Sequence, residues 1–291
     1  MKKHFQLVLD WLVYTNVWHS MGLASVSYMS MVFLHLPIVV TPLVSSFAIF
    51  FVLYNVNRTT DSSEDAKNYP RRAAFSRKYG KALFYTSTLF GLVLLTFYVF
   101  KEVHSLSLLI FILALGLAYS IPLFPTFKGS SFRLKDILLI KNVTVALSLT
   151  LGTTFLATSY YSAPLTFNSL LLGIFIFTTV LINTIIFDLR DVSGDMGSHI
   201  TTIPAFLGTK KTKQLLYLLN TWLFLSMSCF LILEQTPKFL YFVNLNCLYA
   251  YFFIYAFGKP WMDTNFLCDI IVDGEYILIG ILTFAGTLVF S

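Results

Sequence analysis

Three aspartates near the end of an apolar run are the residues best suited to chemistry in this sequence. Asp188, Asp191 and Asp195 stand at i, i+3 and i+7. If the apolar run is a helix that continues past its end, the three carboxylates share one helical face. Ionised carboxylates this close repel one another and need a counter-charge. A hard divalent cation bound to phosphate oxygens supplies such a charge, and Mg²⁺ is the commonest.

A second polar stripe follows an apolar run far upstream. Asn57, Asp61 and Asp65 stand at i, i+4 and i+8, and Asn68 and Arg72 come shortly after. One amide and two carboxylates suit a Mg²⁺ ion that keeps ligand positions for a phosphate, whose outer oxygens a guanidinium binds in bidentate fashion. Taken alone, each stripe has a structural alternative, which is a charged or capped loop outside the lipid headgroups.

The composition indicates the environment in which these residues act. The 291-residue chain is 57% hydrophobic and 12% charged, with a mean hydropathy of +0.75, whereas about 25% of the residues in soluble domains are charged. We therefore predict an all-α, polytopic membrane bundle in which residues 1–291 form a single domain, because the loops are too short for a second core. The net charge of +6 does not indicate nucleic-acid binding, because in a membrane protein the Lys and Arg residues mark the cytoplasmic loops.

Apolar runs and loop charges predict the topology. A spanning helix needs about 20 mostly apolar residues, which predicts nine spans. They are residues 11–34, 38–57, 81–100, 104–122, 137–158, 164–187, 213–233, 239–257 and 274–290. The basic loops 58–80, 123–136 and 188–212 then fall on the side of the N-terminus, which is cytoplasmic by the positive-inside rule. Both polar stripes lie on that side, so we expect one shared site.

The two stripes together resemble the motifs of the UbiA superfamily of intramembrane prenyltransferases. Residues 57–65 (NRTTDSSED) and 68–72 (NYPRR) resemble the family's NDxxDxxxD and the following NxPxR. The aspartate triplet downstream matches the second motif, DxxDxxxD, and Thr202 and Pro204 match its Thr-x-Pro. The resemblance covers nearly the whole chain, and nine helices is the family's count.

The chain departs from the family pattern at three positions. Arg58 stands where the family usually has an aspartate, so one acidic oxygen is missing. His199 and Thr201 stand where a glycine and a basic residue are common, which removes a cation that could bind diphosphate. Lys210 or Lys211 is a candidate to replace that cation.

The resemblance implies Mg²⁺-dependent transfer of a prenyl group from an isoprenoid diphosphate to a hydrophobic acceptor, aromatic or lipid, within the membrane. It implies catalytic carboxylates at Asp61, Asp65, Asp188, Asp191 and Asp195, and metal ligands at these five aspartates and Asn57. It implies diphosphate binding by Asn68, Arg72, Tyr119, Lys135 and Lys141. Asp188 or Asp195 is alternatively a ligand of the acceptor or of a cationic side chain. Among the five histidines, only His199 is expected near this chemistry.

Other function classes make different predictions. An ion-coupled transporter would place carboxylates near the membrane midplane, whereas these lie at cytoplasmic helix ends beside Arg and Lys. The predicted spans exclude a soluble prenyl chain-elongating enzyme, and an inactive membrane scaffold would follow if Arg58 abolished metal binding. We therefore expect an integral protein of the cytoplasmic membrane whose active site faces the cytoplasm.

Overall fold

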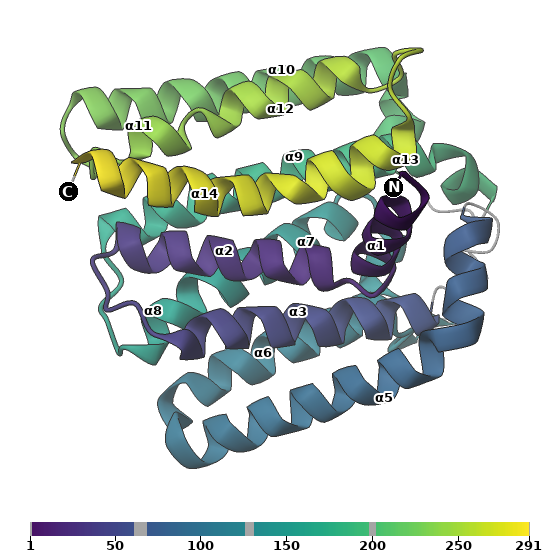
Figure 1. Ribbon diagram of the computed structural model, residues 1–291, viewed down its shortest axis with the longest axis horizontal. Helices are drawn as coiled ribbons and strands as arrows, with labels where there is room; N and C mark the ends of the chain where they lie inside the picture. The colour runs from purple at the N-terminus through teal and green to yellow at the C-terminus, as the bar shows by residue number, and fades with distance from the viewer. Residues whose placement is uncertain (1, 61–68, 126–130, 198–201, 291) are drawn as a thin grey trace.

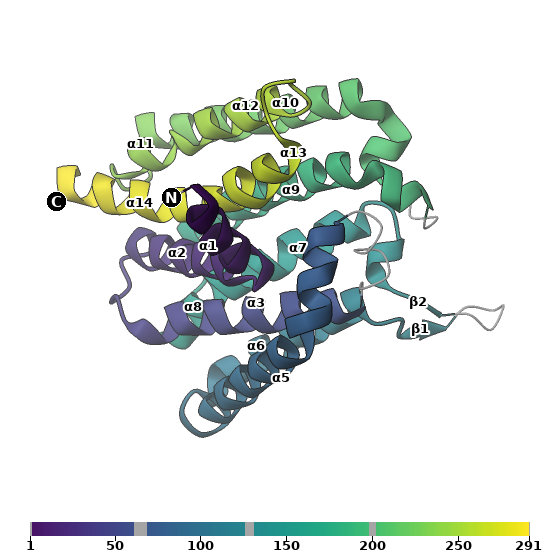
Figure 2. The same cartoon turned by 45° about the vertical axis from the view of Figure 1, so that its right-hand side comes forward.

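The computed structural model describes residues 2–60, 69–125, 131–197 and 202–290, with side chains at all of these except 2–7, 131 and 193–197. Its long helices run side by side as a bundle (Figure 1). In the described chain, the strands are two residues each: β1 (Phe124–Pro125) pairs antiparallel with β2 (Ser131–Phe132). This pair projects from one end of the bundle (Figure 2). The predicted all-helical class is confirmed.

The helices follow the predicted apolar runs, with additional short helical pieces at the ends. In chain order they are α1 (Lys2–Tyr14), α2 (Val17–Phe33), α3 (Val40–Thr60), α5 (Pro70–Lys101), α6 (Val103–Ser120), η1 (Leu134–Asp136), α7 (Ile140–Thr150), η2 (Leu151–Phe155), α8 (Leu156–Tyr160), α9 (Phe167–Gly197), α10 (Ile203–Ile232), α11 (Leu240–Val243), α12 (Asn246–Ala256), α13 (Thr264–Phe266), η3 (Leu267–Val272) and α14 (Asp273–Phe290).

The predicted count of nine spans is not confirmed. Within the described residues, six helical runs are long and apolar enough to cross a membrane. They are Val40–Thr60, Pro70–Lys101, Val103–Ser120, Ile140–Tyr160, Phe167–Val192 and Ile203–Ile232. The first predicted span breaks at Asn16, whose φ of 64° is left-handed and interrupts the helical hydrogen bonds between α1 and α2. The eighth divides into α11 and α12, and the ninth, α14, carries Asp273 and Glu275 in its first turn.

Two helices extend into segments that were predicted to be loops. α5 begins at Pro70, well before the predicted start at residue 81, and proline is favourable at the first helical position. α9 continues past residue 187 to Gly197, so Asp188 and Asp191 lie on a helix. With 32 residues, α5 is about 48 Å long, which exceeds a hydrocarbon core of about 30 Å.

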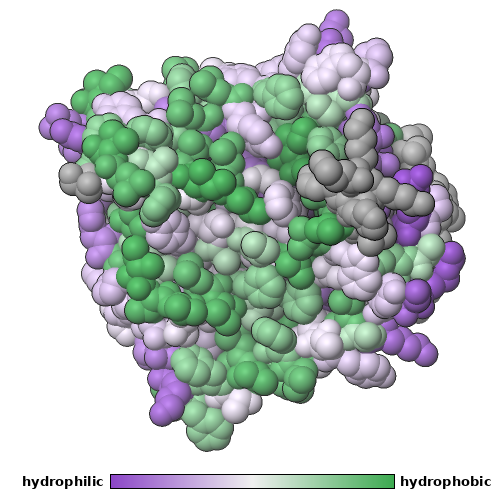
Figure 3. Space-filling view, viewed as in Figure 1, coloured by the Kyte–Doolittle hydropathy of each residue, from purple (hydrophilic) through white to green (hydrophobic). Residues whose placement is uncertain are grey.

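Burial separates inner from outer helices. Within the spanning window, 67% of α9 is buried against 17% of α5. α9 packs on α7 and α10, and α2 packs on α3 and α14. Apolar side chains form broad areas of the face drawn in Figure 3, mixed with residues of intermediate hydropathy, and the most hydrophilic ones lie toward the edges. The lateral surface is therefore suited to lipid, and the polar ends to water.

Two glycines bring α2 and α14 into close contact. A Cβ added at Gly22 would lie 2.8 Å from Tyr276 Cβ, and one added at Gly280 would lie 2.7 Å from Ser25 Cβ. Larger residues would separate the two backbones, as at other close helix contacts in membranes. This contact fixes the first turns of both helices side by side.

Candidate functional site

A cavity of about 290 Å³ lies among helix ends. The helix ends that line it are those at the right in Figure 1. Its wall comes from the C-terminal ends of α3 and α6, the C-terminal half of α9, and the N-terminal ends of α2, α7 and α14. Residues that are far apart in sequence therefore face one space. The two stripes predicted to share a site contribute Asn57, Asp188 and Asp191 to this one wall.

Asp188 is held by α7. Its side chain is 2% exposed, and Lys141 Nζ lies 2.8 Å from Oδ1. The other oxygen, Oδ2, accepts a hydrogen bond of 2.7 Å from Asn142 Nδ2. Both carboxylate oxygens are thus engaged, because neighbouring positions at the start of α7 present a cation and an amide to the same turn of α9.

Asp191 belongs to a network that joins three elements. Its Oδ1 accepts hydrogen bonds from the Tyr69 hydroxyl and, at 3.0 Å, from Arg190 Nε. Arg190 also donates from Nη1 to Asp269 Oδ1 at 2.6 Å, and its guanidinium lies over the rings of Tyr69 and Phe187 at 4.7 and 4.8 Å. Because Tyr69 precedes α5 and Asp269 lies in η3, this network ties α9 to both.

The first stripe contributes an amide and an unexpected cation. Asn57 Oδ1 accepts a hydrogen bond of 3.0 Å from Ser120 Oγ. Arg58 Nη2 donates to Asn16 Oδ1 at 2.6 Å, and Asn16 Nδ2 donates to Asn55 Oδ1 at 3.2 Å. Arg58, the departure from the family pattern, therefore brings positive charge to the cavity wall.

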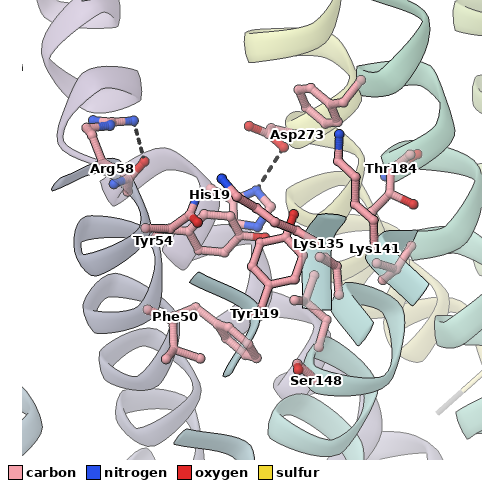
Figure 4. A pocket seen from close by; sticks show the side chains of 18 of the residues that line it. His19, Phe50, Tyr54, Arg58, Tyr119, Lys135, Lys141, Ser148, Thr184 and Asp273 are labelled. Atoms are coloured by element: carbon pink, nitrogen blue, oxygen red, sulfur yellow. Dashed lines mark hydrogen bonds and ion pairs between the residues drawn. The ribbon is translucent and has the colours of Figure 1, made fainter. Parts of the chain in front are cut away.

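The residues expected to bind diphosphate converge on the same space. Arg72, Tyr119, Lys135 and Lys141 all line the cavity, and Lys135 is only 4% exposed. Figure 4 shows Arg58, Tyr54 and Phe50 on one side, and Lys141 and Thr184 on the other. The cavity thus gathers cations at its charged end from α3, α5, η1 and α7.

Arg133, a second basic residue close to the start of α7, has a different role. It binds Asp136 at 2.8 Å within one turn and is not among the residues lining the cavity. Partial burial acts to raise the pKa of the Asp136 carboxyl, but the hydrogen bonds and charge of Arg133 outweigh it, so the pKa lies below its ordinary value. This pair stabilises the η1 turn that places Lys135.

Some predicted ligands fall outside the described part of the chain. These are Asp61, Asp65, Asn68 and the side chain of Asp195, and the two departures from the family pattern at His199 and Thr201 also lie outside it. Among the described residues, no group of three or more His, Cys, Asp or Glu side chains could hold a metal ion. The described part supplies Asn57, Asp188 and Asp191 of the predicted set. All six predicted ligands are carboxylate or amide oxygens, the donor type that Mg²⁺ prefers.

His199, the one histidine expected near the chemistry, lies outside the described residues, and a histidine that was not predicted takes a place at the cavity. His19 lines the cavity, and its Nδ1 lies 2.8 Å from Oδ1 of Asp273. The two residues are separated by 254 positions, so sequence spacing gave no direct signal for this pair. An indirect signal existed, since the first and last predicted helices were both expected to begin on the same side of the membrane, near these residues.

Below the charged end, the cavity wall becomes aromatic and then apolar. Tyr54, Tyr119 and Tyr276 line the middle, while Phe50 and Leu149 are among the apolar residues deeper in the bundle. One end of the cavity is therefore suited to an anion and the other to a hydrocarbon chain. The arrangement can hold an amphipathic anion with its charged head at the helix ends.

Comparisons with known proteins agree with this architecture. The model of the UbiA prenyltransferase family matches residues 14–266. The fold is similar to that of a UbiA homolog from Archaeoglobus fulgidus solved with DMAPP and Mg²⁺, with a TM-score of 0.67 and 14% identity over 96% of this chain and 99% of that chain. A structure of a UbiA homolog from Archaeoglobus fulgidus with GPP and Mg²⁺ has a TM-score of 0.68 and 14% identity, and the match covers 97% of this chain and 99% of that chain.

A third solved structure is the apo form of a UbiA homolog from Aeropyrum pernix K1. It has a TM-score of 0.63 and 16% identity, and the match covers 94% of this chain and 97% of that chain. No curated protein matches the chain in a sequence comparison. At these identities the solved structures establish the fold, and the family model carries the assignment.

Proposed function

The chain belongs to the UbiA prenyltransferase family, and from this premise we propose that it transfers a prenyl group from an isoprenoid diphosphate to a hydrophobic acceptor within the membrane, with Mg²⁺ as cofactor. The observation that carries the proposal is the polarity of the cavity, which has clustered cations and carboxylates at one end and apolar side chains at the other. The binding of DMAPP or GPP with Mg²⁺ by the Archaeoglobus fulgidus homolog supports the same donor class here.

The donor's diphosphate fits the charged end. Arg58, Arg72 and Lys135 supply guanidinium and ammonium groups around it, and such groups make strong charge-assisted hydrogen bonds to phosphate. Lys141 is oriented by Asp188 at 2.8 Å, so its position does not depend on the ligand. These cations stabilise the charge that builds up on the diphosphate as the allylic C–O bond ionises.

The proposed metal ligands are Asn57, Asp191 and, outside the described residues, Asp61 and Asp65, with the side chain of Asp195 completing the set. When bound, Mg²⁺ supplies further positive charge to the leaving diphosphate. Tyr69 and Arg190 hold the Asp191 carboxylate in one orientation at the cavity wall. Asp188 engages Lys141 and Asn142 with its two oxygens, so we propose that its main role is to orient Lys141.

The deeper part of the cavity fits the prenyl chain and shields the allylic cation. Phe50, Leu53 and Leu149 line the apolar part, where a hydrocarbon chain displaces water. The rings of Tyr54 and Tyr119 lie between this part and the charged end, where the π faces of aromatic rings can stabilise a cation. Because the adjoining loops are basic, we propose that this end faces the cytoplasm.

The test is a transfer assay with purified protein in lipid nanodiscs. The reaction contains radiolabelled geranylgeranyl diphosphate, Mg²⁺ and a lipid extract from the host, and we expect a prenylated product. Asp191→Ala and Asp61→Ala should each abolish it, whereas Asp263→Ala, at the start of the short α13 helix and outside this cavity, should not. Full turnover in EDTA would refute the metal assignment. The absence of both product and released diphosphate would refute the function.

A further inference from the structure

His19 is held in a fixed orientation on the cavity wall. Its Nδ1 is 2.8 Å from Oδ1 of Asp273, and the residue is 9% exposed. The ring packs against Tyr54 and Tyr276 with centroid distances of 4.4 and 5.5 Å, both edge to face. The close contact of α2 and α14 at Gly22 keeps Asp273 opposite His19. Figure 4 shows His19 near Tyr54, with its bond to Asp273 dashed.

The hydrogen-bond partner of Nδ1 determines which nitrogen of the neutral ring carries the proton. An ionised carboxylate only accepts hydrogen bonds, so Nδ1 carries the proton that joins it to Asp273. In the neutral ring, Nε2 then keeps its lone pair and is a proton acceptor. Nε2 is buried and makes no hydrogen bond within the described residues. A buried acceptor without a partner is unfavourable, and a hydroxyl group of a bound molecule would remove that cost.

We propose that His19, oriented by Asp273, is the catalytic base that takes the proton from the prenyl acceptor, and that the acceptor therefore bears a hydroxyl group. This inference rests on the proposed function. In the reaction, the allylic C–O bond of the donor breaks and its electron pair leaves on the diphosphate. An electron pair of the acceptor forms the new bond to the allylic carbon. The acceptor's hydroxyl proton, or the ring proton of a hydroxylated aromatic, passes to Nε2 of His19.

The position of His19 suits this step. It lies one helical turn inside Asn16, which binds Arg58 at the charged end, and it faces tyrosines. The acceptor's reacting atom must lie beside the first carbon of the prenyl chain, which is directly below the diphosphate. Asp188 and Asp191 are poor alternatives as bases, because both carboxylates bind cationic side chains.

Among the described groups that face this part of the cavity, the imidazole of His19 is the best suited to act as a base. α14 presents Asp273 and Tyr276, and α3 presents Tyr54. Asp273 serves as the orienting carboxylate, in the same relation that an aspartate has to the histidine of a hydrolase triad. The phenols are weak bases at neutral pH. Glu275 follows on α14 but is not among the residues lining the cavity.

The test compares two products of one reaction. Protein in nanodiscs receives labelled geranylgeranyl diphosphate, Mg²⁺ and the host lipid extract, and both prenylated product and released diphosphate are counted. For His19→Gln, we expect the ratio of transfer to release to fall by about 100-fold or more. The reason is that ionisation continues while the allylic cation is captured by water. Asp273→Asn keeps the histidine but removes the orienting charge, and should lower the ratio at least about tenfold.

His104→Gln is the matched control, because His104 is a half-exposed histidine on α6 outside the cavity. It should leave the ratio at the wild-type value. Equal losses of transfer and release in both His19→Gln and Asp273→Asn would indicate a structural role and overturn the proposal, as would an unchanged ratio. If His19→Gln does not fold, Asp273→Asn alone decides. A wild-type protein that releases no diphosphate would instead refute the proposed function.

Discussion

Replacing Lys141 with methionine tests whether Asp188 is held as a buried ion pair. Lys141 Nζ lies 2.8 Å from Asp188 Oδ1, and the side chains are 20% and 2% exposed. Methionine removes the charge and leaves the carboxylate with the hydrogen bond from Asn142. Loss of one partner of a buried pair costs about 3–5 kcal/mol. Because Lys141 is one-fifth exposed, we expect the free energy of unfolding to fall by about 3 kcal/mol.

A double-mutant cycle separates the pair from its surroundings. Asp188→Asn removes the other charge, and the double variant keeps neither ion of this pair, so it should be more stable than Lys141→Met alone. We expect a coupling energy of about 2–3 kcal/mol. Unfolding is followed by tryptophan fluorescence in lipid nanodiscs titrated with denaturant. Lys210→Met, an exposed lysine on α10, is the control and should stay within about 0.5 kcal/mol of the wild type.

Two results would refute this reasoning. A coupling energy below about 0.5 kcal/mol would mean that Lys141 and Asp188 do not act as a pair. The second result would be that Mg²⁺ raises the melting temperature of the wild type but not that of Asp188→Asn. The Asp188 carboxylate would then be a metal ligand rather than the group that orients Lys141.

Three other predictions follow from described contacts. A Cβ at Gly152 would lie 2.6 Å from Phe50 Cζ, so Gly152→Ala should push that ring toward the cavity and lower the free energy of unfolding by about 1–3 kcal/mol. The narrower cavity should favour shorter prenyl donors, which an activity assay with donors of increasing chain length would measure. Arg58→Gln should raise the donor KM by roughly tenfold with a smaller change in kcat, because a charged hydrogen-bond donor is lost from the cavity wall. For Asp136, whose folded pKa is lowered below the ordinary value of 3.8, the stabilisation by Arg133 is present above the unfolded pKa and is lost as pH falls through the folded pKa. Arg133→Gln should therefore cost up to about 1 kcal/mol at about pH 6 and less at about pH 3, as denaturant titrations at both pH values would show.

The second stripe could be predicted because its geometry is local. Asp188 and Asp191 are three residues apart, and any helix continuing through them presents both on one face. The side chains that bind these aspartates could not be predicted in the same way. Lys141, on α7, and Tyr69, just before α5, reach them from other parts of the bundle, so their contacts depend on packing that no sequence spacing encodes.

The pair of His19 and Asp273 shows the same limit more strongly. These residues meet because Gly22 and Gly280 allow α2 and α14 to approach closely, and the register of that contact is a property of side-chain volumes across two helices. The count of spans failed for a backbone reason. Asn16 adopts a left-handed conformation within an apolar run whose composition predicted an unbroken helix.

The low burial of α5 has a practical consequence for handling this protein. This helix has most of its surface open to lipid, yet Tyr69, the residue just before it, bonds to Asp191 at the cavity. In a membrane, lipids would contact α5 directly, and the residue that orients the candidate metal ligand Asp191 immediately precedes this helix. We expect extraction into short-chain detergent to slow turnover while circular dichroism stays constant, and added phospholipid to restore the rate. Unchanged turnover after delipidation would mean that lipid contacts of α5 do not affect the reaction.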